Sequence, residues 1–208
     1  MEPFALLAAV LSSPWLVPAM VLMVAVDGPL PMLPSETVLL SATASAVVTR
    51  DLALLSALFL AAASGSVLGD LATHALGRGS HRLLPRTAHA DGGIARWVRA
   101  NLFRRPVAAL VAARFLPGGR LLSCAAAGRM GLPRQVFLRA SAVSALAWSL
   151  YMFAIGAALG PVTGGNPLLC VVAGGMLAVL TTGAFAVAQR VRSTIRRTGP
   201  APLPQPAG

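Results

Sequence analysis

The sequence predicts an all-α integral membrane protein with about four transmembrane helices, two oppositely oriented re-entrant hairpins in an inverted-repeat arrangement, and a cytoplasmic amphipathic helix. Of its 208 residues, 56% are hydrophobic and 11% are charged, and the mean hydropathy is +0.75. A soluble domain carries about 25% charged residues, so this chain has too little polar surface to cover a water-soluble globule. The 20 glycines and 16 prolines lie mostly inside apolar segments, which predicts interrupted helices.

The charge balance predicts membrane lipids as partners. The net charge is +11, and all 17 basic residues are arginines. A basic excess can indicate nucleic-acid binding, but these arginines flank apolar segments, where they orient the chain and meet anionic headgroups. We therefore expect no nucleic-acid partner. The cysteines and histidines show no metal-ligand spacing, so we also expect no metal and no cofactor.

The first part of the chain predicts a span, a hairpin and a second span. Residues 5–26 are apolar and long enough to cross a membrane. Residues 28–50 hold three prolines and then only about twelve apolar residues, too few to cross about 30 Å of hydrocarbon at 1.5 Å per residue. Residues 52–76 can span again. The segment 28–50 is therefore predicted to be a re-entrant hairpin.

A basic loop is predicted next, over residues 78–105, which contain seven arginines and favour the cytoplasm. Five apolar residues near its end recur at helical spacing, which predicts an amphipathic interfacial helix; the alternative is an irregular basic loop. These residues are Ile94, Trp97, Val98, Leu102 and Phe103.

The second part of the chain predicts another hairpin and two further spans. Residues 107–127 are apolar but are split by proline and glycine, whereas residues 140–159 and 168–188 are clean spans. Arginines on both sides of 107–127 favour the same cytoplasmic face, so this segment must enter and leave from one side. Both termini are then cytoplasmic. Residues 1–197 form one membrane domain, and a Pro-rich tail over 198–208 is predicted to be disordered.

Four ionisable residues at membrane depth are the candidate site: Glu36, Asp70, Arg114 and Arg120. Charges inside a membrane are costly and face protein or water, so they usually have a function. Glu36 and Arg120 each flank a proline break, and we expect them to meet near the midplane. The arginines would bind an anionic headgroup, and Glu36 or Asp70 would take up and release a proton. The structural alternative is a static salt bridge that pins the hairpin tips together.

Three neighbouring expectations concern the acidic residues. Asp70 could lie at a helix end or pair with Arg78, which follows it by about two turns. His74 lies one turn after Asp70, so a hydrogen bond between these two side chains is expected. Asp27 is predicted to be a solvated loop residue.

Several motifs together resemble the DedA family, the bacterial branch of the SNARE-associated Golgi protein (VTT domain) superfamily. The most specific is R-F-L-P-G-G-R at residues 114–120, which resembles the family element R-F-x-P-G-x-R. Pro34-Ser35-Glu36 resembles its proline–acid element, and Gly69-Asp70 begins a stretch in which His74 replaces the usual tyrosine. The resemblance covers about residues 15–190.

The resemblance implies a fold with two re-entrant hairpins in the bacterial cytoplasmic membrane. It also implies transport of phospholipids or of polyprenyl phosphates such as undecaprenyl phosphate, with a link to the proton-motive force. The residues matching the family's functional acids and arginines are the same four: Glu36, Asp70, Arg114 and Arg120.

The leading hypothesis is a proton-linked lipid flippase or scramblase for an anionic lipid. The alternatives are a proton-coupled exporter of small solutes or drugs and a membrane-homeostasis protein. An intramembrane enzyme would need a histidine nucleophile among basic residues or clustered aspartates around a metal, and the sequence offers neither, so no catalytic residue is predicted. The sequence leaves open which lipid moves, in which direction, and whether the chain forms a homo-oligomer.

Overall fold

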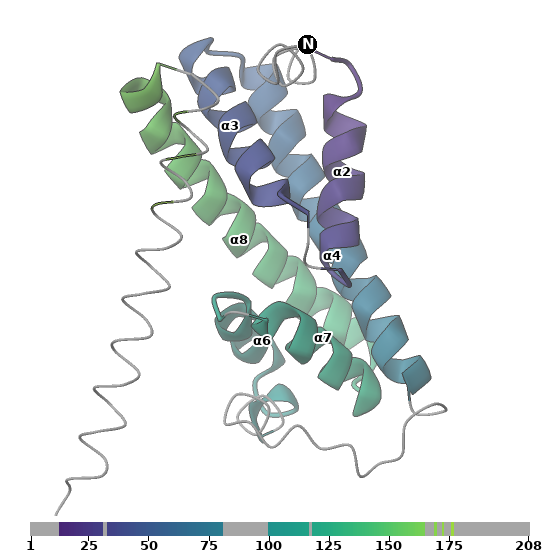
Figure 1. Ribbon diagram of the computed structural model, residues 1–208. Coiled ribbons are helices and arrows are strands. Elements are labelled where there is room, and N and C mark those ends of the chain that lie inside the picture. The colour runs from purple at the N-terminus through teal and green to yellow at the C-terminus, as the bar shows by residue number, and fades with distance from the viewer. Residues whose placement is uncertain are drawn as a thin grey trace, which may run out of the picture.

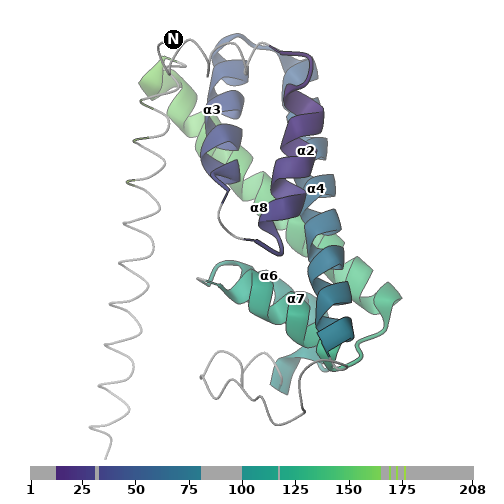
Figure 2. The ribbon, with the colours of Figure 1, turned by 45° about the vertical axis from the view of Figure 1, so that its right-hand side comes forward.

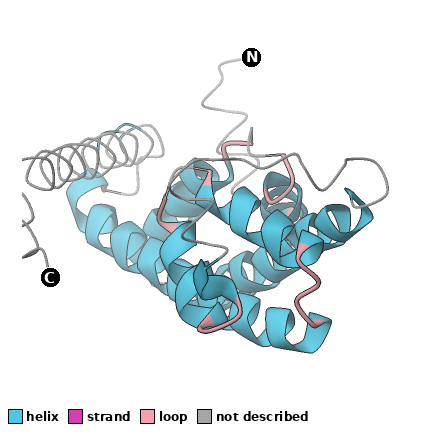
Figure 3. Ribbon diagram, turned by 90° about the horizontal axis from the view of Figure 1, so that it is seen from below, coloured by secondary structure: helices cyan, strands magenta, loops and turns pink. Residues whose placement is uncertain are grey.

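The computed structural model describes residues 13–30, 33–80, 100–116 and 118–164, and the single positions 169, 172 and 176. Every regular element in these ranges is a helix, and none of the described residues lies in a strand (Figure 3). The all-α prediction is confirmed for this part of the chain. Three predicted features lie wholly or mostly outside the described residues: the span at 168–188, the tail at 198–208 and the amphipathic helix.

Six helices build the described fold. They are α2 (Leu16–Asp27), α3 (Ser35–Val48), α4 (Leu52–Gly79), α6 (Pro106–Arg114), α7 (Gly119–Arg129) and α8 (Arg134–Thr163). Figures 1 and 2 show α2 running from one end of the molecule to its middle and α3 returning to the same end. Then α4 runs the whole length, α6 and α7 form a second hairpin in the other half, and α8 runs back.

Two helices are long and apolar enough to cross a membrane, α4 with 28 residues and α8 with 30. At 1.5 Å per residue they measure about 42 and 45 Å, more than the roughly 30 Å of a hydrocarbon core. Only 39% and 33% of their most apolar windows are buried, so neither is the enclosed core helix of a soluble protein. Exposed leucines lie along all of α4, at Leu52, Leu60, Leu68 and Leu76, which suits contact with lipid.

The first hairpin differs from its prediction. Its two arms are α2 and α3, and residues 28–34, which contain three prolines, connect them in the sequence. The 12 residues of α2 measure about 18 Å, too short to span. The prediction of a spanning helix over 5–26 is therefore wrong for residues 16–27, and the predicted hairpin 28–50 contains only one arm. Apolar length did not distinguish a span from a hairpin arm, because residues 1–12 continue the hydrophobic run before α2 begins.

A second helical hairpin covers the segment 107–127; its entry and exit at one membrane face stays a prediction. Its arms are α6 and α7, and a short turn after Arg114 joins them. Proline suits the first turn of α6, because the N–H group that proline lacks would have no acceptor within the helix at that position. Gly118 adopts φ +69°, a left-handed conformation that glycine reaches without strain, and α7 begins at the next residue.

The helix packing has a twofold pattern. The four most extensive helix pairs are α2 with α4, α7 with α4, α3 with α8 and α6 with α8. Exchanging α2 with α6, α3 with α7 and α4 with α8 converts this set of pairs into itself. Since α4 and α8 also run in opposite directions (Figure 1), the two halves of the fold are related as an inverted repeat would require.

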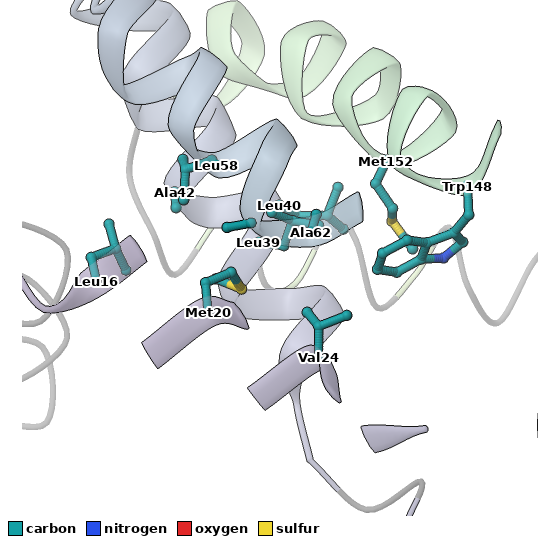
Figure 4. Packing of buried hydrophobic residues seen from close by; sticks show 11 residues of the cluster. Leu16, Met20, Val24, Leu39, Leu40, Ala42, Leu58, Ala62, Trp148 and Met152 are labelled. Carbon is teal, nitrogen blue, oxygen red and sulfur yellow. The ribbon is translucent and has the colours of Figure 1, made fainter. Parts of the chain in front are cut away.

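Two apolar clusters stabilise the two halves. The first joins α2, α3, α4 and α8, and Figure 4 shows Met20, Leu39, Leu58 and Trp148 among its side chains. The second joins α6, α7 and the start of α8, with the fully buried Phe137 as its largest side chain. The apolar core is thus divided, and the middle of the molecule between the clusters is left for polar side chains.

Glycines on α4 allow α2 to pack directly against its backbone. A Cβ at Gly69 would lie 2.5 Å from the carbonyl oxygen of Ala25, and one at Gly65 would lie 2.6 Å from that of Val21. Real Cβ atoms do not approach oxygen this closely, so any larger residue would push α2 away. This close approach places the end of α2 beside the middle of α4.

Gly69→Ala should therefore destabilise the protein by about 1–3 kcal/mol, the usual cost of overpacking. Gly79→Ala is the matched control, because no atom lies within 4 Å of its added Cβ and alanine favours a helix. Thermal unfolding in detergent measures both variants. Equal melting temperatures for the two would contradict the close packing of α2 on α4.

Candidate functional site

Asp70 is the centre of an ion-paired cluster in the middle of the molecule. It lies on α4, and its side chain is 2% exposed. Its Oδ1 accepts a hydrogen bond from Arg120 Nε at 2.8 Å. Its Oδ2 accepts from Arg114 Nη1 at 3.1 Å and from the Ser141 hydroxyl at 2.8 Å. One carboxylate therefore joins α4 to α6, α7 and α8.

Arg114 is the last residue of α6, and its side chain is only 4% exposed. One terminal nitrogen binds Asp70, and the other donates to the Ser66 hydroxyl. The guanidinium carbon lies 5.2 Å from the ring centroid of Trp148, which adds a cation–π contact. Its Nε is buried and has no acceptor among the described residues. The cluster thus holds one N–H donor that Asp70 does not use.

Arg120 connects the second hairpin to the first. It is the second residue of α7 and is 18% exposed. Besides binding Asp70, its Nη2 donates to the Ser66 carbonyl oxygen at 3.2 Å. Its Nη1 lies 3.9 Å from Asp27 Oδ2, which forms a longer ion pair with the end of α2. Arg120 therefore bridges α7, α4 and α2.

Asp27 belongs to the site, which corrects its prediction as a solvated loop residue. It is the last residue of α2, is 18% exposed, and accepts a hydrogen bond from the Ser35 hydroxyl at 3.2 Å. The turn that follows it lies in the middle of the molecule (Figure 2). Asp27 was predicted to lie in a solvated loop. The structure places it against Arg120, because the turn after α2 is the tip of a hairpin inside the molecule.

Glu36 lies beside the cluster and forms no ion pair with any described residue. It is the second residue of α3 and is exposed. Its carboxylate interacts with the Trp148 indole N–H, and Asp27 and the two arginines are close enough to act on its charge. The predicted direct meeting of Glu36 with Arg120 is not found; the carboxylates that pair with that guanidinium are those of Asp70 and Asp27. The structure brings together Asp70, Arg114 and Arg120 and leaves Glu36 next to them.

The charged residues of the two hairpins occupy equivalent positions. Asp27 ends α2 as Arg114 ends α6, and Glu36 is the second residue of α3 as Arg120 is the second residue of α7. The helix exchange described above therefore converts the two acids of the first hairpin into the two bases of the second. The hairpin tips carry opposite charge, so their attraction favours contact in the middle of the molecule.

Neither of the other partners predicted for Asp70 is found. The Nε2 atom of His74 lies 3.4 Å from the Leu132 carbonyl oxygen, and its ring stacks on Phe137 with centroids 4.3 Å apart. Arg78 forms no ion pair with Asp70. Both arginine partners of Asp70 come instead from the second hairpin, more than forty residues along the chain.

Two site residues escaped the sequence reasoning. Ser66 lies one helical turn before Asp70, so its spacing put it on the same face of α4 and could have indicated it. Ser141 is 71 residues from Asp70 and has no local signal. No group of three or more His, Cys, Asp or Glu side chains in the described residues is arranged to hold a metal ion.

Comparison with protein families identifies the class of this protein. The family profile described as "VTT domain" matches residues 33–158, which is more than half of the chain and includes all four predicted site residues. The chain therefore belongs to the VTT domain family, the domain of DedA and SNARE-associated proteins, as its motifs indicated. This family is associated with membrane proteins of the DedA type, and the two long apolar helices are compatible with that. Searches of curated proteins and of solved structures give no significant match.

Asp70→Ala should destabilise the protein by about 3–5 kcal/mol, because it leaves two guanidiniums without their counter-charge. Asp27→Ala should cost less than about 1 kcal/mol, since its ion pair is longer and partly exposed. Chemical unfolding in detergent compares the two. Similar losses for both variants would show that Asp70 is not the centre of the cluster.

Proposed function

We propose that this protein is a lipid transporter, a flippase or scramblase that moves an anionic lipid across the cytoplasmic membrane of a bacterium. The observation that supports this most strongly is the pair of guanidiniums, Arg114 and Arg120, held at the meeting point of two opposed helical hairpins. The substrate class is a lipid with a phosphate headgroup, such as undecaprenyl phosphate or a phospholipid. The chain changes the position of this lipid and catalyses no covalent step.

The arginines suit a phosphate headgroup for a geometric reason. A planar guanidinium presents several N–H donors in a fixed fork that matches the spacing of phosphate oxygens. Arg114 and Arg120 bind the same carboxylate, so both forks already converge on one point. Broken helices at membrane depth are tolerated where they line a binding cavity, as in secondary transporters. Two opposed hairpins therefore support a binding site that the lipid headgroup can reach alternately from the two faces of the membrane.

Glu36 supports a link to protons. It is a carboxylate beside the arginine pair with no ion pair among the described residues, so it can change its charge without breaking the Asp70 cluster. Protonation of Glu36 removes a negative charge from the tip of the first hairpin and weakens the attraction of this tip for the second. Glu36 is therefore the proposed protonation switch.

The orientation rests on the surface arginines. The end of α4, the end of α7 and the start of α8 lie at one end of the molecule in Figure 1, and they carry Arg78, Arg129, Arg134 and Arg139. Cytoplasmic segments are enriched in arginine and lysine. This end is therefore assigned to the cytoplasm, and the C-terminus is proposed to lie there, after the predicted span 168–188. A cytoplasmic N-terminus is not proposed, because α2 begins at the opposite end of the molecule (Figure 1).

Arg120→Ala should reduce lipid translocation to the background of empty liposomes, because the headgroup loses one of its two forks. The assay compares labelled undecaprenyl phosphate with bulk phospholipid in proteoliposomes. Arg104→Ala is the control, since Arg104 is an exposed residue in the turn before α6. Arg120→Lys should keep part of the activity, because it keeps the charge but not the fork. Full transport by a folded Arg120→Ala variant would contradict the assignment.

Glu36→Gln should abolish the response of transport to a pH gradient, because the amide cannot take up a proton. The same liposomes, with and without an imposed gradient, measure this response. The control is Asp51→Asn, an exposed acid that caps α4 through Leu54 N and whose amide replacement is also a good cap. A gradient response equal to that of the wild type would rule out Glu36 as the switch.

A further inference from the structure

We infer that the Asp70 carboxylate occupies the position of the phosphate group, and that a phosphate monoester binds Arg114 and Arg120 by displacing it. This inference rests on the proposed function and identifies how the same site is regulated. Its starting point is the set of donors around Asp70: two guanidiniums and the Ser141 hydroxyl, all within 3.1 Å. Such a set binds a carboxylate and a phosphate by the same hydrogen bonds.

The buried donor that Asp70 leaves unused favours a larger anion. Arg114 Nε is buried and has no acceptor among the described residues. Both oxygens of Asp70 are already engaged, Oδ1 by Arg120 and Oδ2 by Arg114 and Ser141. A phosphate monoester presents three terminal oxygens, one more than a carboxylate. Its third oxygen can accept from Arg114 Nε, so the exchange removes the cost of an unsatisfied buried N–H.

The charges of the site set a condition on this exchange. Three carboxylates, from Asp27, Glu36 and Asp70, face two guanidiniums. A phosphate monoester adds at least one further negative charge, and an unpaired buried charge is costly. The anion therefore enters together with a proton, which neutralises one of the three carboxylates. When this proton leaves, Asp70 binds the arginines again and expels the anion.

Four of the helices packed around Asp70 bring further charged and titratable groups close to it. The charged and titratable groups near it on the packed helices are Asp27 on α2, Glu36 on α3, Arg114 on α6, and Arg120 and Cys124 on α7. From α8, Ser141 donates a hydrogen bond to Asp70, and this side chain is uncharged. On α4 itself, His74 interacts with the Leu132 carbonyl oxygen instead.

Ligand binding to the full chain in detergent tests the exchange. The probes are dodecyl phosphate, a phosphate monoester with a lipid-like tail, and inorganic phosphate, each in mildly acidic and mildly alkaline buffer. A pH indicator in weak buffer measures proton uptake. The wild type should bind dodecyl phosphate more weakly in alkaline buffer and take up about one proton for each bound ligand. Binding of dodecyl phosphate without inorganic phosphate identifies a lipid headgroup, and equal binding of both identifies a free phosphate; both outcomes support the exchange.

Asp70→Asn is the decisive variant, because the amide cannot neutralise the arginines. If the Asp70 carboxylate occupies the arginines in nine of ten molecules or more, its removal should tighten the binding of dodecyl phosphate in alkaline buffer about tenfold or more. The proton uptake should also disappear. Asp51→Asn, the same chemical change at an exposed position, should bind like the wild type. Unchanged or weaker binding by a folded Asp70→Asn variant would overturn the inference.

The wild-type protein decides the question if Asp70→Asn does not fold. Binding of dodecyl phosphate without proton uptake, or equally tight binding in acidic and alkaline buffer, would overturn the inference. A wild type that binds neither probe at any pH would contradict the proposed function itself, whereas wild-type binding with unchanged variants contradicts only the exchange.

Discussion

The structure depends on one buried carboxylate. Asp70 is bound by two arginines of the second hairpin, and one of them also reaches Asp27 at the end of the first. Removing such charges from water is costly, and only dense hydrogen bonding offsets the cost. Ser66 and Ser141 supply part of this hydrogen bonding. A membrane protein has little hydrophobic driving force to hold its helices together, so this polar cluster gives the two hairpins a defined contact.

The twofold arrangement explains why the charges meet where they do. Each hairpin places one charged residue at the end of its first arm and one at the start of its second. The first hairpin carries acids at these positions and the second carries bases, so two structurally similar tips attract each other. The match does not extend to Asp70, which lies on a long helix. This additional acid makes carboxylates outnumber guanidiniums, which is the basis of the proposed link between anion binding and protons.

Much of the fold could be predicted from the arginines and prolines. Arginines on both flanks of residues 107–127 identified the second hairpin, and prolines marked the turn of the first. The arms of the first hairpin could not be assigned, because α2 has the same apolar composition as a spanning helix. Asp70, Arg114 and Arg120 were recognisable as charges in apolar segments. The contacts of Asp70 with the two arginines and with Ser141 were not predictable. These residues are far apart in the sequence and meet through tertiary packing, which leaves no local sequence signal.

The contact between Asp70 and the arginines can be measured directly by solid-state NMR in lipid bilayers. The sample carries ¹³C in the aspartate carboxyl groups and ¹⁵N in the arginine guanidinium groups, and dipolar recoupling reports carboxyl carbons close to these nitrogens. We predict a strong short-range coupling that Asp70→Asn removes and that Asp27→Asn largely preserves. A coupling that is absent, or that survives Asp70→Asn unchanged, would contradict the central place of this carboxylate.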